Sequence, residues 1–139
     1  MTFRETLDQH LRAIRGRDLP GLIETLPPDA LTLIMADGRL VRTTDEFIEL
    51  HRGWFAASTW SLDAEVVSLI ETPEVGVAVL RLDYRDDPAD APPIREASYL
   101  TLIFAMREGR WVMVQDQNTP IRSNPPASTD PAAAAAARR

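Results

Sequence analysis

The sequence predicts an α+β fold in which three N-terminal helices pack on one face of an antiparallel sheet. Apolar residues recur at helical spacing early in the chain, whereas later segments alternate apolar and polar residues as half-buried strands do. A two-residue turn at Glu108-Gly109 predicts how the last two strands pair. Because this pairing leaves a broad apolar face on the sheet, the helices are expected to cover it.

Three helices are expected before the long strands. The first carries an apolar stripe made of Phe3, Leu7, Leu11 and Ile14. Asp18 can cap a second, short helix, which the proline pair at positions 27 and 28 ends. Thr43 and Glu46 form a capping box for the third helix, which runs to about residue 57. Its apolar stripe holds Phe47, Leu50, His51 and Trp54.

The remaining apolar segments predict strands. A short strand at 31–35 turns through Asp37-Gly38 into a second one at 40–41. Longer strands are expected at about 59–71, 76–85, 95–107 and 110–118. The segment between the second and third of these, DDPADAPP, is typical of a mobile acidic loop.

Length and composition limit the domain organisation. A chain of 139 residues that is 45% hydrophobic fits one domain with a real core, and we place this domain at residues 1–121. Residues 122–139 form a low-complexity tail rich in proline and alanine, which is expected to be disordered or to form a late alanine helix. We expect this tail to contribute little to stability.

Composition also excludes several classes of function. The net charge of −6 disfavours binding to nucleic acid. No window approaches about 18 consecutive apolar residues and the N-terminus lacks the apolar segment of a signal peptide, so we expect a cytoplasmic protein without a membrane partner. Cysteine and lysine are both absent, which excludes thiolate and Schiff-base catalysis and a P-loop. Two distant histidines without an acidic cluster make a metal site unexpected, and no other cofactor is predicted.

The closing strand and the residues after it read GRWVMVQDQNTPI, from Gly109 to Ile121. This stretch resembles the end of the nuclear-transport-factor-2-like (NTF2-like) superfamily, in particular its SnoaL-like and SgcJ/EcaC-type branch. Members commonly end in a Trp-x-Ile strand that runs into a His- or Gln-Asn-Thr segment. The order of the predicted elements agrees with this superfamily over residues 1–121. The resemblance implies a strongly curved sheet that the helices close at one end and leave open at the other, as an apolar cone.

The turn at Glu108-Gly109 also predicts which side chains share a face of the sheet. With strict alternation, Leu102 lies opposite Gln115 and Leu100 lies opposite Gln117, on the more apolar face that we assign to the helices. The opposite face is too polar for a core and too apolar for a free surface. It is predicted to form a homodimer interface, as the resemblance also implies, through Arg81, Asp83, Tyr99, Thr101, Val112, Val114 and Asp116.

The candidate site residues share the helix-facing side of this arrangement and are His51, Trp54, Trp60, Tyr84, Gln115 and Gln117. The two glutamines would orient an apolar ligand by hydrogen bonds, and His51 is the candidate catalytic proton carrier. Each candidate also has a structural alternative. The two glutamines can be an amide pair whose hydrogen bonds are satisfied by backbone or water, and His51 can be a structural histidine at the edge of an apolar stripe. The aromatic residues can be ordinary core packing. His10 is assigned to the surface.

The resemblance implies two classes of function. The first is a protein that binds a small apolar molecule, with isomerase- or cyclase-like acid-base chemistry and without metal, accessory to secondary-metabolite biosynthesis of the polyketide or enediyne type. The alternative is a non-catalytic association domain, which predicts a filled cone and an oligomer larger than a dimer. Ketosteroid isomerases of the superfamily use a buried carboxylate base. Strict alternation places Asp83 and Asp116 on the other face and leaves only Glu96 on the helix-facing side.

Overall fold

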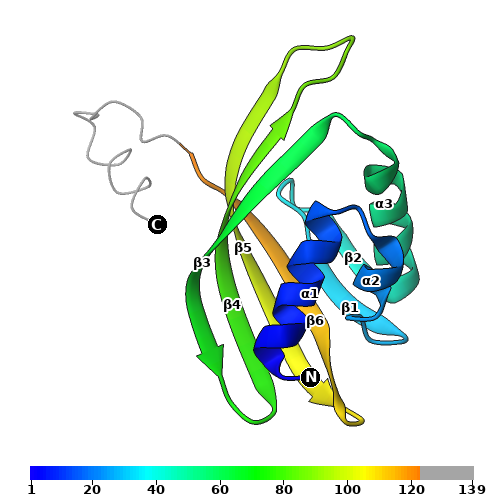
Figure 1. The fold of residues 1–139 in the computed structure, drawn as a ribbon, viewed down its shortest axis with the longest axis vertical. Helices are drawn as coiled ribbons and strands as arrows, with labels where there is room; N and C mark the ends of the chain where they lie inside the picture. The colour runs from blue at the N-terminus through cyan, green and yellow to red at the C-terminus, as the bar shows by residue number, and fades with distance from the viewer. Residues whose placement is uncertain (123–139) are drawn as a thin grey trace, which may run out of the picture.

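The computed structural model describes residues 1–122, which form three helices and a six-stranded sheet (Figure 1). The elements are α1 (Phe3–Arg15), α2 (Leu19–Ile23), β1 (Ala30–Ile34), β2 (Leu40–Thr43), α3 (Thr44–Ala56), β3 (Trp60–Glu71), β4 (Val75–Asp86), β5 (Ile94–Arg107) and β6 (Arg110–Pro120). Almost all of the tail predicted at 122–139 lies outside the described residues. None of the described helices is long and apolar enough to cross a membrane, and the cytoplasmic location stays a prediction.

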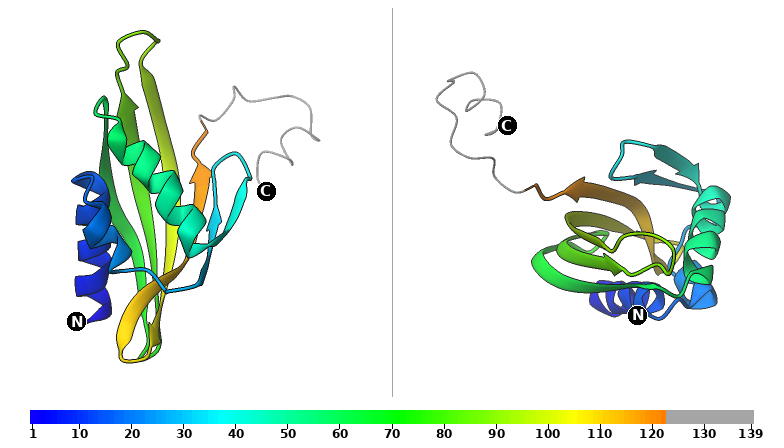
Figure 2. Two further views of the ribbon diagram at one scale, coloured as in Figure 1. Left: turned by 90° about the vertical axis from the view of Figure 1, so that its right-hand side faces the viewer. Right: turned by 90° about the horizontal axis from the view of Figure 1, so that it is seen from above.

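The predicted α+β architecture is confirmed. The sheet has the strand order β2-β1-β6-β5-β4-β3, and it curves around α1 and α3, which lie on its concave side (Figures 1 and 2). One detail departs from a purely antiparallel sheet: β1 and β6 run parallel, with Thr32 opposite Gln115 and Ile34 opposite Gln117. These two strands are joined through α3 and four further strands, so no hairpin forces them into opposite directions.

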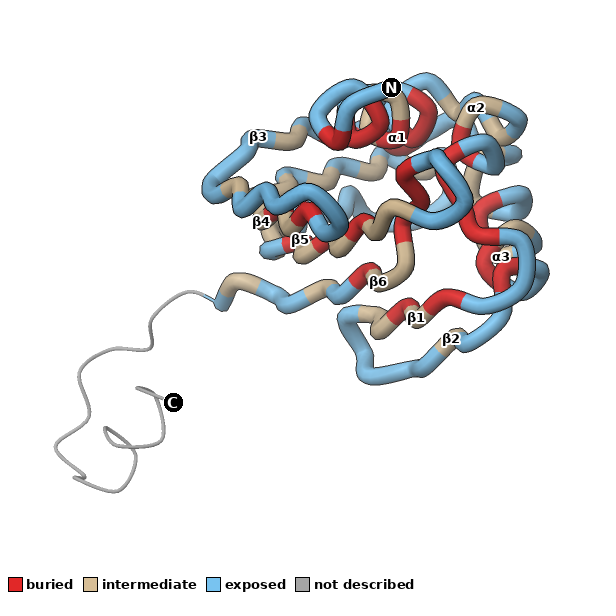
Figure 3. The backbone as a smooth tube through the Cα atoms, turned by 90° about the horizontal axis from the view of Figure 1, so that it is seen from below, coloured by how far each residue is buried: buried red, intermediate tan, exposed pale blue. Residues whose placement is uncertain are grey.

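The helix ends follow the capping signals in the sequence. Thr43 Oγ1 accepts a hydrogen bond of 3.1 Å from the backbone N–H of Glu46, which starts α3 where the capping box predicts. The Glu46 side chain, which lies within the described residues, makes no return bond to the backbone N–H of Thr43, whereas in α1 Thr2 and Glu5 form a reciprocal capping box. The apolar side of α1 then packs on the sheet through Phe3, whose ring lies 5.6 Å from that of Phe104. Buried residues accordingly follow the inner sides of the helices and the facing strands (Figure 3).

Gly76 on β4 is needed for this contact between α1 and the sheet. A Cβ atom at position 76 would lie 2.5 Å from the ring of Phe3, well inside van der Waals contact. The absence of a side chain at Gly76 therefore lets the first turn of α1 lie directly on the sheet.

A β-bulge in the last hairpin changes the faces of β6. Phe104 pairs with Met113 as predicted. The residue before Phe104 on β5, Ile103, pairs with Gln115 and not with Val114. Val114 is therefore the extra residue of the bulge, and every residue after it points to the opposite side from the one that strict alternation predicts. The predicted pairs of Leu102 with Gln115 and of Leu100 with Gln117 are wrong. Leu102 lies opposite Asp116 and Leu100 lies opposite Asn118.

Candidate functional site: an apolar cavity with a buried carboxyl group

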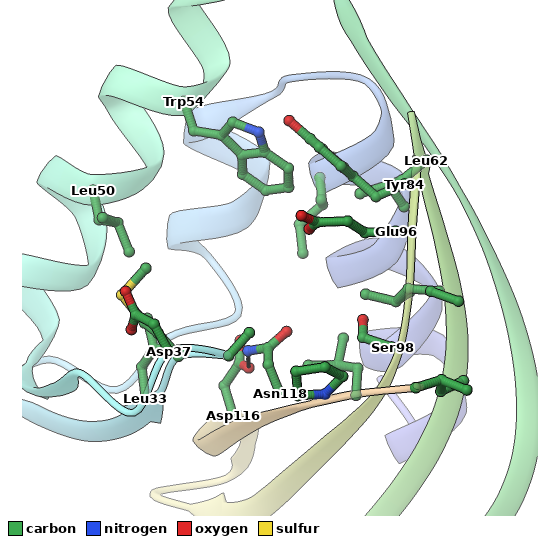
Figure 4. A pocket seen from close by; sticks show the side chains of 18 of the residues that line it. Leu33, Asp37, Leu50, Trp54, Leu62, Tyr84, Glu96, Ser98, Asp116 and Asn118 are labelled. Atoms are coloured by element: carbon green, nitrogen blue, oxygen red, sulfur yellow. Dashed lines mark hydrogen bonds between the residues drawn. The ribbon is translucent and has the colours of Figure 1, made fainter. Parts of the chain in front are cut away.

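A cavity of about 790 Å³ lies between the concave side of the sheet and the helices. Its wall is mostly apolar and includes six leucines from α1, α3 and four strands, namely Leu11, Leu33, Leu50, Leu62, Leu82 and Leu100. Polar side chains are concentrated at two places. Asp116 and Asn118 lie on one wall, and Tyr84 and Glu96 lie across the cavity from them, with Trp54 nearby (Figure 4).

Asp116 is the most deeply buried acid of this cavity, with 5% of its surface exposed. Its Oδ1 accepts a hydrogen bond of 3.0 Å from Nδ2 of Asn118, and the same amide donates to the backbone oxygen of Ile34 at 3.3 Å. Burial raises the pKa of Asp116 to about 7, although the hydrogen bond from Asn118 acts in the opposite direction. At neutral pH the carboxyl group therefore exists in both forms and can either donate or accept a proton.

His51 is a second titratable group on the cavity wall. Its Nδ1 lies 2.8 Å from the backbone oxygen of Phe47, one helical turn earlier, so this nitrogen carries the proton and Nε2 is left as an acceptor. The ring stacks on Phe47 at 3.9 Å between centroids. Burial lowers the pKa of His51, so the side chain is neutral at neutral pH.

The aromatic residues predicted for the mouth of the cone divide into two groups. Trp54 and Tyr84 line the cavity, whereas Trp60 is only 2% exposed and is not part of the lining. Trp60 instead stacks on Trp54 at 4.1 Å, and the guanidinium group of Arg17 lies 4.0 Å from the ring centroid of Trp60. Arg17 also donates to the backbone oxygens of Ala57 and Trp60. Trp60 thus belongs to the packing behind the cavity wall, which is the core role given above as the alternative for the aromatic residues.

The structure corrects the placement of both glutamines. Gln115 and Gln117 follow the bulge at Val114, so their side chains lie on the outward face of the sheet and outside the cavity lining. Asp116 and Asn118 occupy the inward positions that strict alternation assigns to Gln115 and Gln117. One signal in the sequence favours a bulge: Val112, Met113 and Val114 form a continuous apolar run that interrupts the alternation.

The surface assignment of His10 is also wrong, because this residue of α1 is completely buried. Thr25 Oγ1 donates its hydrogen to the backbone oxygen of Leu22 at 2.6 Å, so His10 Nδ1, at 2.8 Å, donates to Thr25 Oγ1. Nε2 has no hydrogen-bond partner among the described residues. Burial lowers the pKa of His10 to about 3, with a smaller contribution from His51. His10 lies outside the cavity lining and is a core residue.

Within residues 1–122, no group of three or more histidine, cysteine, aspartate or glutamate side chains is arranged to hold a metal ion.

Comparison with known proteins assigns the family. The sequence profile of the SnoaL-like domain matches residues 4–121, and the chain therefore belongs to the SnoaL-like domain family, as the closing strand predicts. The finer assignment to the SgcJ/EcaC-type branch stays a prediction. Among curated proteins, none matches this chain in sequence.

Solved structures share the fold at low sequence identity. A protein from Thiobacillus denitrificans, provisionally described as a calcium/calmodulin-dependent protein kinase type II association domain, has a TM-score of 0.73 at 17% identity, covering 87% of this chain and 96% of its own. A ketosteroid isomerase-like protein from Erwinia carotovora atroseptica has a TM-score of 0.71 at 15% identity, covering 86% and 94%. A protein with a cystatin-like fold from Caulobacter vibrioides has a TM-score of 0.67 at 20% identity, covering 96% and 91%. These similarities establish the NTF2-like fold.

Proposed function

We propose that this protein binds a small, largely apolar molecule in the cavity and exchanges a proton with it through Asp116. The observation that carries this proposal is the buried Asp116 carboxyl group, held by Asn118 in an otherwise apolar wall. An acid in such a place costs stability, because burial penalises its charged form. A carboxyl group retained against this cost is a candidate for function.

The chemistry that fits this arrangement is acid-base catalysis of the isomerase or cyclase type. The neutral form of Asp116 can donate a hydrogen bond to a carbonyl or hydroxyl oxygen, and the ionised form can remove a proton from carbon or oxygen. His51 Nε2 offers a second acceptor on the same cavity. Asp116 thus replaces His51 as the first candidate for the catalytic proton carrier, and His51 is kept as the second.

The apolar wall suits a rigid carbon skeleton of polyketide-like or steroid-like size, because sites for small molecules commonly enclose about 300–1,000 Å³. On this basis we extend the proposal to an accessory role in secondary-metabolite biosynthesis of the polyketide or enediyne type. What supports this extension is the family resemblance together with the leucine-rich wall.

A thermal-shift screen of a metabolite library tests the proposal. A ligand present at a hundred times its dissociation constant adds about 2.7 kcal/mol to the free energy of unfolding. Ligands that stabilise the wild type should stabilise the Asp116→Leu variant less, because the only buried hydrogen-bonding acid of the described cavity is removed. Glu74→Gln, in the turn between β3 and β4 and outside the cavity lining, serves as the control. Ligands that stabilise the wild type and Asp116→Leu equally would exclude Asp116 from the binding site.

A homodimer through the outward face of the sheet remains a second proposal. This face exposes large apolar side chains, including Ile70 at 59% and Tyr99 at 41%. Two residues predicted for the interface do not contribute to it, since Val112 and Asp116 are buried within the protomer. The proposed interface keeps the other predicted residues, which are Arg81, Asp83, Tyr99, Thr101 and Val114.

The same exposed face favours the alternative of a non-catalytic association domain, and so does the similarity to the Thiobacillus protein. That alternative predicts a filled cone, and the cavity of about 790 Å³ argues against it.

A further inference from the structure

We infer that the ligand carries a positive charge, an ammonium group on an apolar body, which sits at the rim of the cavity between Trp54, Tyr84 and Glu96. This inference rests on the proposed binding function and specifies the class of molecule that the site takes. It follows from the balance of charges on the cavity wall and from the position of the aromatic rings.

The charged side chains that line the cavity are Asp37, Arg95, Glu96 and Asp116. Two of them are already neutralised by a neighbour: Arg95 pairs with Asp87 at 2.9 Å, and Asp37 pairs with Arg39 at 2.9 Å. The other two, Glu96 and Asp116, form no ion pair among the described residues. The uncompensated charge of the lining is therefore negative, and Glu96 supplies most of it because Asp116 is ionised only in part at neutral pH.

None of the α1 and α3 residues that line the cavity carries a positive charge that could balance these acids, and the guanidinium group of Arg17 lies behind the wall, 4.0 Å from the ring centroid of Trp60. His51 is neutral because burial lowers its pKa, and the remaining α1 and α3 residues of the lining are apolar. An anionic ligand would therefore meet carboxylates without a cationic partner, whereas a cation would complete the charge balance.

The rim next to Glu96 also offers aromatic rings. The ring centroids of Trp54 and Tyr84 are 6.3 Å apart, and Trp60 stacks behind them on Trp54 at 4.1 Å. Figure 4 shows the Glu96 carboxylate extending into the cavity beside Tyr84. Electron-rich ring faces beside a carboxylate form the environment that recognises ammonium groups in proteins.

The acidic groups near this rim also affect the Tyr84 hydroxyl group. Its hydroxyl group lies 3.4 Å from Oδ2 of Asp86, to which it donates a weak hydrogen bond. Burial raises the pKa of Tyr84, and the charges of Asp86 and Glu96 raise it further. A cation placed here meets the Glu96 carboxylate and two rings, while the leucine-lined interior takes its apolar body.

Isothermal titration calorimetry with three matched probes tests the inference on the full-length protein near neutral pH. The probes are adamantane cages that carry an amine, an alcohol or a carboxylate at the bridgehead, so that the apolar body is the same in all three. We expect the protonated amine to bind about tenfold more tightly than the alcohol, and the carboxylate to bind most weakly. Added salt should weaken binding of the amine and leave that of the alcohol unchanged.

Two variants test whether the bound ammonium group lies beside Glu96. Glu96→Gln should reduce the affinity for the amine roughly three- to tenfold and leave the affinity for the alcohol unchanged. Glu74→Gln removes the same charge from the turn between β3 and β4, outside the cavity lining, and should change neither. An unchanged preference for the amine in Glu96→Gln would overturn the rim assignment.

The outcomes separate this inference from the proposed function. Equal affinities for amine and alcohol, or tightest binding of the carboxylate, would overturn the cationic ligand and leave a binding cavity in place. Absence of binding by all three probes would count against both the cation and the proposed function.

Discussion

Asn118 Nδ2 donates a hydrogen bond of 3.0 Å to Oδ1 of Asp116, two residues earlier on β6, and both side chains face the cavity. The second bond of this amide, to the backbone oxygen of Ile34 on the neighbouring strand, holds both N–H groups in place. Asn118 is thus oriented by β1, and it in turn stabilises the ionised form of Asp116.

Replacing Asn118 by leucine should therefore raise the pKa of Asp116 above its value of about 7, because the hydrogen bond that favours ionisation is lost. Carbon-detected NMR titration of the Asp116 carboxyl measures this directly. Gln117→Leu is the matched control, since Gln117 is exposed on the outward face, and it should leave the titration unchanged. A shift in the control would mean that the two faces of β6 are not separated as the bulge requires.

Asp116→Asn should stabilise the protein at neutral pH. The pKa of Asp116 is raised from 3.8 to about 7 in the folded state, so the favourable contribution of the neutral acid is complete below pH 3.8 and is lost as pH rises through about 7. Three pKa units correspond to roughly 4 kcal/mol, and the asparagine variant avoids this loss. Urea unfolding of both proteins at several pH values should show their difference growing between about pH 4 and pH 7. A constant difference would contradict the raised pKa.

His10 should cause the opposite pH dependence. Its folded pKa of about 3 lies below the ordinary 6.5, so its contribution to stability is present above pH 6.5 and is lost as pH falls toward 3. Between about pH 6.5 and pH 5 the loss should be about 2 kcal/mol. His10→Asn keeps an amide donor near Thr25 but cannot be protonated, so its unfolding free energy should fall less over this range. Parallel curves for the two proteins would show that His10 does not titrate on unfolding.

Arg17→Ala should destabilise the domain by about 1–3 kcal/mol, since it removes a cation–π contact with Trp60 and hydrogen bonds to two backbone oxygens. Arg17→Lys should recover only part of this loss, because an ammonium group lacks the planar fork. Arg12→Ala is the control: Arg12 makes one exposed ion pair with Asp8 at 3.0 Å, which is worth less than about 1 kcal/mol. Denaturant unfolding measures all three, and equal effects of Arg17→Ala and Arg12→Ala would show that the stack does not contribute.

The proposed homodimer predicts that Tyr99→Arg shifts the protein toward monomer, because it adds a charge to the exposed apolar face. Light scattering over a range of protein concentrations measures the shift. Glu108→Arg changes the charge in the turn between β5 and β6 and should leave the mass unchanged. A wild-type monomer at tens of micromolar, an order-of-magnitude test concentration, would exclude the interface.

Local signals in the sequence determined the elements of the fold. The capping residue Thr43 and the Glu108-Gly109 turn each act within a few residues, and each lies where the structure has a helix start or a hairpin. The proline pair at 27 and 28 predicts the end of α2 less well, because that helix already ends at Ile23. The apolar stripes likewise determined which side of the helices faces the sheet. His51 and Trp54 could be assigned to the cavity for this reason, and Tyr84 by its place in the alternation of its strand.

Only the tertiary structure decided which acid enters that cavity. The bulge at Val114 depends on how β6 bends between β5 and β1, and no short-range pattern specifies that bend uniquely. One extra residue reverses every later side chain, so it moved Gln115 and Gln117 outward and brought Asp116 and Asn118 inward. The burial of His10 was decided in the same way, because the surface that covers it comes from distant residues such as Thr25 and Phe104.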